Sequence, residues 1–88
     1  MSAESQAASL LAAGYIEVEE LRRFKVGGKV HHIGERFHEA YSGTAVIERI
    51  FHRPHRGNDV EMIVRRTRPD RIGEHGYWAD YHTIVVEP

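Results

Sequence analysis

The longest apolar, β-branched run of the chain covers residues 43–51 and reads Gly-Thr-Ala-Val-Ile-Glu-Arg-Ile-Phe. Residues of these types fit a pleated, half-buried surface better than they fit a helix. Apolar side chains occupy both alternating sets of positions, with Val46 and Ile50 in one set and Ala45 and Ile47 in the other. A strand that is covered on both faces shows this pattern. The run therefore predicts the central strand of a small sheet that is packed on both sides.

Shorter strand candidates lie on either side of this run. Glycine, proline and asparagine separate them, with a tight turn expected at residues 57–59 and a strand end at Pro69. One helical turn is expected at residues 19–24, where acidic residues precede basic ones. The spacing predicts about five strands, as in a small barrel or sandwich. The additional strands are expected at residues 15–18, 29–33, 60–67 and 77–86.

The first residues predict a short helix from Ser2 to Ala13. Ser2 is suited to cap its start, and Gly14 is suited to the left-handed conformation that ends a helix. A frayed terminal segment is the alternative, because the first residues are small and polar. We expect a helical extension over residues 1–14 and a β-barrel domain over residues 15–88. The apolar stripe of the helix would consist of Ala7, Leu10 and Leu11.

The composition is that of one small globular domain. The chain has 88 residues, of which 28% are charged and 41% are hydrophobic. It contains no cysteine, which excludes disulfides and a cysteine nucleophile and is compatible with a reducing compartment. No apolar run reaches the ~18–20 residues that a transmembrane helix requires. We expect a cytoplasmic protein without a membrane partner.

Several segments together resemble the SH3-like small β-barrels, and the KOW and Tudor-like branches in particular. Those branches carry a "V-G-D-x-V" opening before a "G-x-V" strand, and Gly28 stands here where they usually have aspartate. The resemblance covers roughly residues 24–87 and implies a binding fold for nucleic acid, peptide or protein partners. Its segments are Val26-Gly27-Gly28-Lys29-Val30, Gly43-Thr44-Ala45-Val46 and Asp59-Val60-Glu61-Met62-Ile63-Val64, followed by a tryptophan and a last short strand.

Residues 49–72 are rich in arginine. They hold seven arginines and three acidic residues, although the formal net charge of the whole chain is −1. In a hairpin with its turn at residues 57–59, the arginines before the turn would face those after it across the two strands. Together they could bind a phosphate backbone. Neutralisation by neighbouring acids is the alternative, and the sequence pI of 6.6 favours it. The candidate nucleic-acid or partner contacts are Arg49, Arg53, Arg56, Arg65, Arg66 and Arg68.

Aromatic residues near the C-terminus form a second candidate surface. Tyr77 and Trp78, with Tyr81 nearby, could stack on bases or on a peptide if their rings are exposed. The alternative, which a single tryptophan in so short a domain favours, is that Trp78 fills the core and one tyrosine caps it. Tyr77 and Trp78 therefore complete the set of candidate binding residues.

Metal and catalytic motifs are lacking. The chain has seven histidines, but His31 and His32 are adjacent and would point to opposite faces of a strand. No spacing typical of zinc ligands occurs, and no serine, histidine and acid can be grouped from their spacing. We expect no metal, no cofactor and no catalysis. The histidines would instead add positive charge below roughly pH 6.5.

Taken together, the sequence predicts a non-catalytic binding module. The leading interpretation is protein–protein interaction or assembly, including self-association into a homo-oligomer. The alternative is a nucleic-acid-binding module that uses the arginine-rich residues 49–71. The uneven charge distribution is typical of a polar partner or of a self-complementary surface.

Overall fold

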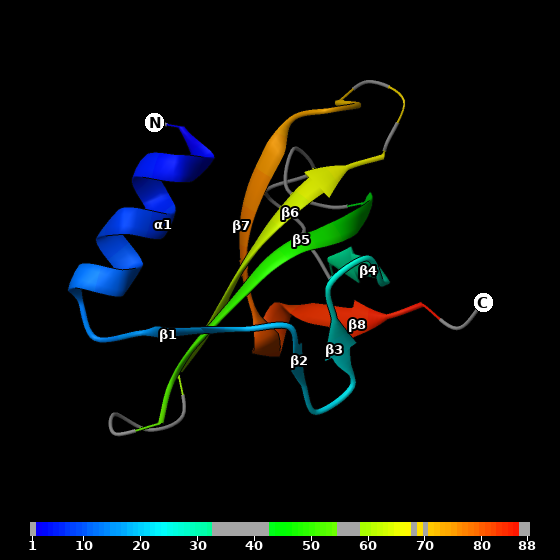
Figure 1. The fold of residues 1–88 in the computed structure, drawn as a ribbon. Coiled ribbons are helices and arrows are strands. Elements are labelled where there is room, and N and C mark those ends of the chain that lie inside the picture. Colours follow the sequence, from blue (N-terminus) through cyan, green and yellow to red (C-terminus); the bar gives the residue numbers. More distant parts are fainter. Residues whose placement is uncertain (1, 33–42, 55–58, 68, 70, 87–88) are drawn as a thin grey trace.

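The computed structural model describes residues 2–32, 43–54, 59–67, 69 and 71–86. These residues form a mostly β fold with one short N-terminal helix, as predicted (Figure 1). The elements in chain order are helix α1 (Ala3–Ala12), strands β1 (Ile16–Val18), β2 (Glu20–Leu21), β3 (Phe24–Lys25), β4 (Lys29–His32), β5 (Gly43–Arg53), β6 (Asp59–Arg66) and β7 (His75–Ala79), the 3-10 turn η2 (Asp80–His82) and β8 (Thr83–Val85).

The long strand β5 is the centre of the main sheet, as its apolar run predicts. It pairs with β6 along one side, while β4 and β1 pair with its first and last parts on the other side. The sheet has the order β7-β6-β5-β4-β8, with β1 attached to β5 outside this path, and all the strand pairs are antiparallel. Because β7 and β8 stand at opposite ends of this order, the sheet is open among the described residues.

A bulge in β5 changes which side chains face the core. The register with β6 shifts between Ile47 and Arg49, so an extra residue is inserted in β5 there. Ile47 and Ile50 both belong to the inner cluster, whereas simple alternation would place them on opposite faces. The predicted assignment of sides is therefore wrong beyond Ile47, because alternation holds only where the ladder is regular.

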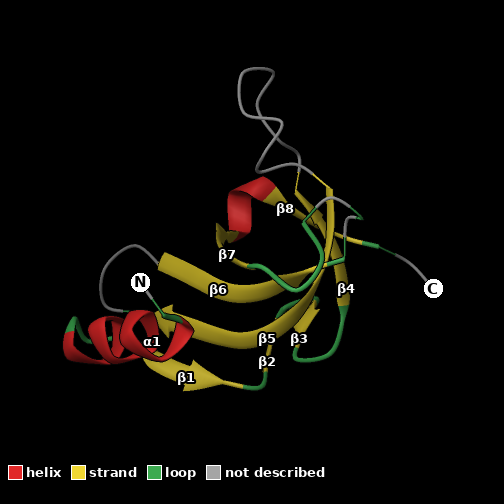
Figure 2. Ribbon diagram, turned by 90° about the horizontal axis from the view of Figure 1, so that it is seen from above, coloured by secondary structure: helices red, strands yellow, loops and turns green. Residues whose placement is uncertain are grey.

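The sheet curls around an inner core and is covered on its outer face by α1 (Figure 2). The outer cluster joins Ala7 and Leu10 of α1 to Phe51 and Ile63 of the sheet. The predicted double covering of the central strand is thus confirmed. The inner cluster consists of Phe24, Val30, Ala45, Ile47, Ile50, Val60, Met62, Val64 and Trp78.

Helix α1 begins where its sequence predicts. The side chain of Ser2 caps it by accepting a hydrogen bond of 3.0 Å from the backbone N–H of Ser5. Leu10 is buried, but Leu11 is 47% exposed and takes no part in the docked face. Within the described residues no helix is long and apolar enough to cross a membrane.

Two short segments differ from their predicted structures. Residues 19–24 form most of the β2–β3 hairpin instead of a helical turn, with Leu21 paired to Phe24. Arg22 and Arg23 are the two residues of its tip, and Arg22 has a φ of 57°. The C-terminal strand predicted for residues 77–86 is divided by η2 into β7 and β8. Turn η2 takes the chain from one end of the sheet to the other.

Candidate functional site

Arginines of the predicted interface are paired with acidic residues of this chain. Arg49 holds both carboxylate oxygens of Glu17, at 2.8 Å from Nε and 2.6 Å from Nη2. Arg53 Nη2 donates to Asp59 Oδ2 at 2.5 Å. These guanidiniums are already engaged, and each carries a neighbouring negative charge. They are therefore weaker phosphate ligands than a run of unpaired arginines would be.

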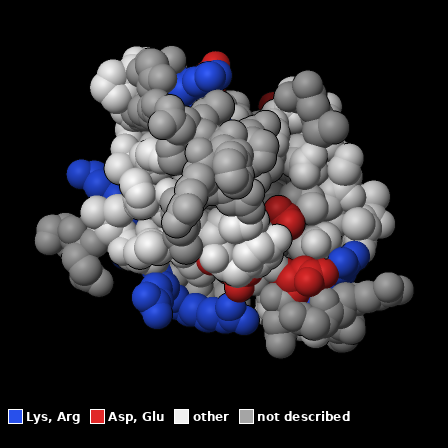
Figure 3. All heavy atoms as spheres, turned by 180° about the vertical axis from the view of Figure 1, so that it is seen from behind, with Lys and Arg blue, Asp and Glu red and all other residues white. Residues whose placement is uncertain are grey.

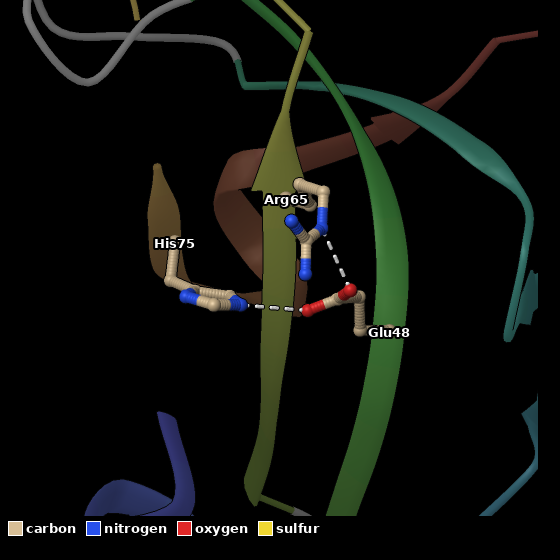
Figure 4. A network of polar contacts seen from close by, with 3 residues as sticks. All are labelled: Glu48, Arg65 and His75. Atoms are coloured by element: carbon tan, nitrogen blue, oxygen red, sulfur yellow. Dashed lines mark hydrogen bonds and ion pairs between the residues drawn. The ribbon is translucent and has the colours of Figure 1, made fainter. Parts of the chain in front are cut away.

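Arg65 belongs to a small network centred on Glu48 (Figure 4). Its Nε donates to Glu48 Oε2 at 2.9 Å, and His75 Nε2 lies 2.8 Å from Glu48 Oε1. The three residues come from the neighbouring strands β5, β6 and β7. Burial raises the pKa of Glu48, but the hydrogen bonds from Arg65 and His75 outweigh it, so the net pKa is lowered. The network ties the outer face of the sheet together.

Two of the predicted binding residues lie inside the protein. Arg66 is 7% exposed and Trp78 is 2% exposed, and the guanidinium carbon of Arg66 lies 6.0 Å from the centre of the Trp78 ring. Trp78 is part of the inner cluster, so its ring offers no face to a partner. Trp78 therefore has the core position that the sequence offered as the alternative to a binding surface. Arg66 was expected on the surface and lies in the interior instead, because alternation in β6 turns it inward. Tyr77 remains on the surface, and Arg56 and Arg68 lie outside the described residues.

An ion pair between Arg22 and Asp80 links the β2–β3 hairpin to η2. Arg22 Nη1 donates to Asp80 Oδ2 at 2.8 Å, which joins residues 58 positions apart. A hollow lies on each side of this ion pair. The larger has a volume of about 460 Å³, and Glu61 is among its lining residues. The smaller has a volume of about 260 Å³, and Arg23 is among its lining residues.

The larger hollow is acidic and has aromatic walls. Asp59, Glu61 and Asp80 line it together with Tyr15 and Tyr81. Tyr81 is 73% exposed, which makes it the most exposed aromatic residue in the described part of the chain. Asp59 and Asp80 each have an arginine partner, whereas Glu61 forms no ion pair with any described residue.

The charged form of Glu61 is disfavoured in this hollow. Burial raises its pKa, and the charges of Asp59 and Asp80 raise it further, while His82 acts in the opposite direction. Burial also raises the pKa of Tyr15. A cation placed in the hollow would favour the charged form of Glu61 and so offset the effects of burial and of the neighbouring carboxylates.

A row of tilted aromatic rings in contact with one another supports the outer wall of this site. The centre of the Tyr81 ring lies 4.0 Å from the centre of the His82 ring, and the centre of the His82 ring lies 5.2 Å from that of His32. His32 in turn lies 4.9 Å from Trp78 in the core. The row connects the exposed tyrosine to buried residues and so restricts its position. His31 is exposed and His32 is buried, as their adjacency in a strand predicts.

Sequence patterns do not indicate this site. Tyr81 is close to Tyr77 and Trp78 in the sequence, but no local signal joins Arg22 to Asp80. Among the described residues no three His, Asp or Glu side chains are grouped as ligands of a metal ion. No protein-family model, no curated protein and no solved structure matches this chain.

Proposed function

We propose that the protein is a non-catalytic module for protein–protein interaction, and that its binding surface is the acidic, tyrosine-lined hollow beside the Arg22–Asp80 ion pair. The observation that carries this proposal is the position of Glu61 in that hollow, without an ion-pair partner among the described residues. Tyrosine supplies large contact area at a low cost in conformational entropy and is enriched at interfaces. The partner would present a lysine or arginine side chain to Glu61.

We also propose that the scaffold is an SH3-like barrel, as the sequence resemblance implies. The order of the main sheet supports this. Four strands, β4 to β7, follow one another as a meander, and β8 then returns through a 3-10 turn to pair with β4. Such scaffolds hold binding residues on loops and turns at a sheet edge. Here η2 and the β2–β3 hairpin have that position.

The nucleic-acid alternative has less support. Arg49, Arg53 and Arg65 are each paired with a carboxylate, and Arg66 is buried. Counterion release needs several cations that face the phosphates together, and their pairing with acids reduces this electrostatic attraction. The alternative remains testable beside the proposal.

A titration followed by NMR tests both functions. Amide shifts of the labelled chain would be recorded with a lysine-rich decapeptide, and separately with a mixed-sequence single-stranded DNA oligonucleotide. We expect the peptide to shift the signals of Glu61 and of residues 79–81. The variant Glu61→Gln should weaken peptide binding roughly fivefold, which corresponds to about 1 kcal/mol. Glu74→Gln, which removes an exposed carboxylate paired with Arg71, is the matched control.

Shifts induced by the DNA around Arg49, Arg53 and Arg65 would instead support the nucleic-acid function. Peptide binding that is unaffected by Glu61→Gln, or that shifts signals elsewhere, would contradict the proposed site.

A further inference from the structure

The two hollows beside the Arg22–Asp80 ion pair carry opposite charges. Glu61 lines one hollow and Arg23 lines the other, and neither forms an ion pair with a described residue. Lys/Arg and Asp/Glu side chains also lie next to each other along the lower part of the face in Figure 3. The fixed ion pair thus has an acidic residue on one side and a basic residue on the other, both available to a partner.

The arrangement fits a two-fold interface. A two-fold axis through the Arg22–Asp80 ion pair exchanges its two sides, so it places the Arg23 hollow of one copy over the Glu61 hollow of the other. The contact between Arg23 of one copy and Glu61 of the other then forms twice, and it is attractive each time. Both of these hollows also have exposed apolar or aromatic walls, Ile84 on the Arg23 side and Tyr81 on the Glu61 side.

The hairpin tip is held in a strained conformation that presents Arg23 outward. Arg22 is the only described residue other than glycine with a positive φ, at 57°. A side chain in the left-handed region costs roughly 1–2 kcal/mol, and glycine is the usual residue there. The ion pair with Asp80 offsets part of this cost and fixes the tip against η2. Strain that is kept at an exposed tip is typical of a functional position.

We propose that the protein associates with a second copy of itself through this face, with Arg23 of each protomer in contact with Glu61 of its partner. The proposal rests on the proposed function and names the partner of the same site. Because the contacts are ionic and lie near the surface, the dimer is expected to weaken as salt screens them.

Analytical ultracentrifugation of the full chain tests the inference. Arg23→Glu and Glu61→Lys should each weaken dimerisation at least about tenfold, because each places like charges opposite one another twice. A mixture of the two variants should form heterodimers as stable as the unchanged protein. In the mixed pair, both contacts again join opposite charges. Lys29→Glu and Glu74→Lys change the charge by the same amounts at other exposed positions, and they serve as matched controls.

Circular dichroism of each variant shows whether it is folded before it is mixed. Dimers that form in the mixture of the two variants, but not in either variant by itself, would support the inference. An unchanged protein that stays monomeric at low salt, or a mixture that does not recover, would overturn it. In that case, peptide binding at Glu61 would still support the proposed function with a different protein as partner. If neither dimerisation nor peptide binding at Glu61 is observed, both proposals are rejected.

Discussion

Arg22 and Asp80 lie 58 positions apart in the chain and are joined by an ion pair of 2.8 Å. The side chain of Arg22 is 52% exposed and that of Asp80 is 24% exposed. An ion pair with this exposure contributes at most about 1 kcal/mol to stability. Its structural role is to join the β2–β3 hairpin to η2, two segments that are distant in the sequence.

Two substitutions separate the effect of backbone strain at Arg22 on stability from the effect of its ion pair. Arg22→Ala removes the ion pair but keeps a Cβ in the left-handed region, so we expect a loss of up to about 1 kcal/mol of unfolding free energy. Arg22→Gly also removes the ion pair but accepts a φ of 57° freely, so it should be about 1 kcal/mol more stable than the alanine variant. Urea denaturation measures both. A glycine variant that is less stable than the alanine variant would contradict a left-handed Arg22 in solution.

Two glutamates should affect the pH dependence of stability in opposite directions. Hydrogen bonds from Arg49 lower the pKa of Glu17 below its ordinary value of 4.5. Its stabilisation is therefore present above pH 4.5 and is lost as the pH falls through the lowered pKa. Burial, together with Asp59 and Asp80, raises the pKa of Glu61. The protonated form of Glu61 is favoured by folding. Its contribution to stability is therefore fully present below pH 4.5 and is lost as the pH rises through the raised pKa.

We expect Glu17→Gln to lower the Tm at pH 7 and Glu61→Gln to raise it. Both differences should shrink as the buffer is made acidic, because the glutamates of the unchanged protein then become neutral. Thermal unfolding between about pH 3 and 7, followed by circular dichroism at low protein concentration, measures both. A Glu61→Gln variant that is less stable at pH 7 would show that the carboxylate has a favourable partner.

The docking of α1 can be tested with two neighbouring leucines. Leu10 is 8% exposed and packs with Phe51 and Ile63, whereas Leu11 is 47% exposed. Leu10→Ala should cost about 2–3 kcal/mol of unfolding free energy through lost burial and a cavity. Leu11→Ala should change it by less than about 0.5 kcal/mol. Equal effects of the two substitutions would contradict this orientation of the helix.

The extent to which this fold could be predicted depends on how local each signal is. The strand at residues 43–51 and the capped helix after Ser2 were predicted because alternation, β-branching and capping act over a few residues. The β2–β3 hairpin was not predicted because its tip is Arg22–Arg23, without the glycine or asparagine that usually indicates such a turn. The bulge after Ile47 left no signal in the residue types either.

The candidate site could not be predicted for a related reason. Its residues come from the position before β1, the β2–β3 tip, β6, the end of β7 and η2, and only the folded sheet brings them together. The arginine-rich segment looked unbalanced because its acidic partners Glu17 and Glu48 precede it in the sequence. The charge count over residues 49–72 includes Asp59, the partner of Arg53, but omits the partners of Arg49 and Arg65.

Gly76 in β7 gives the last prediction. A Cβ at this position would lie 2.8 Å from Trp78 Nε1 and 3.1 Å from Val64 Cγ2, so Gly76→Ala forces a shift around the tryptophan. We expect a loss of about 1–3 kcal/mol of unfolding free energy. We also expect a change in the emission of the single tryptophan, which fluorescence can measure.

Gly73→Ala is the matched control. Gly73 has a φ of 85°, and among the described residues no atom beyond its immediate chain neighbours lies within 4 Å of the position that a Cβ would take. Alanine there introduces only backbone strain, so it should cost about 1 kcal/mol or more without changing the tryptophan emission. An emission change in Gly73→Ala but not in Gly76→Ala would contradict the close packing of Trp78 on Gly76. The pair of variants thus separates backbone strain from crowding in the core.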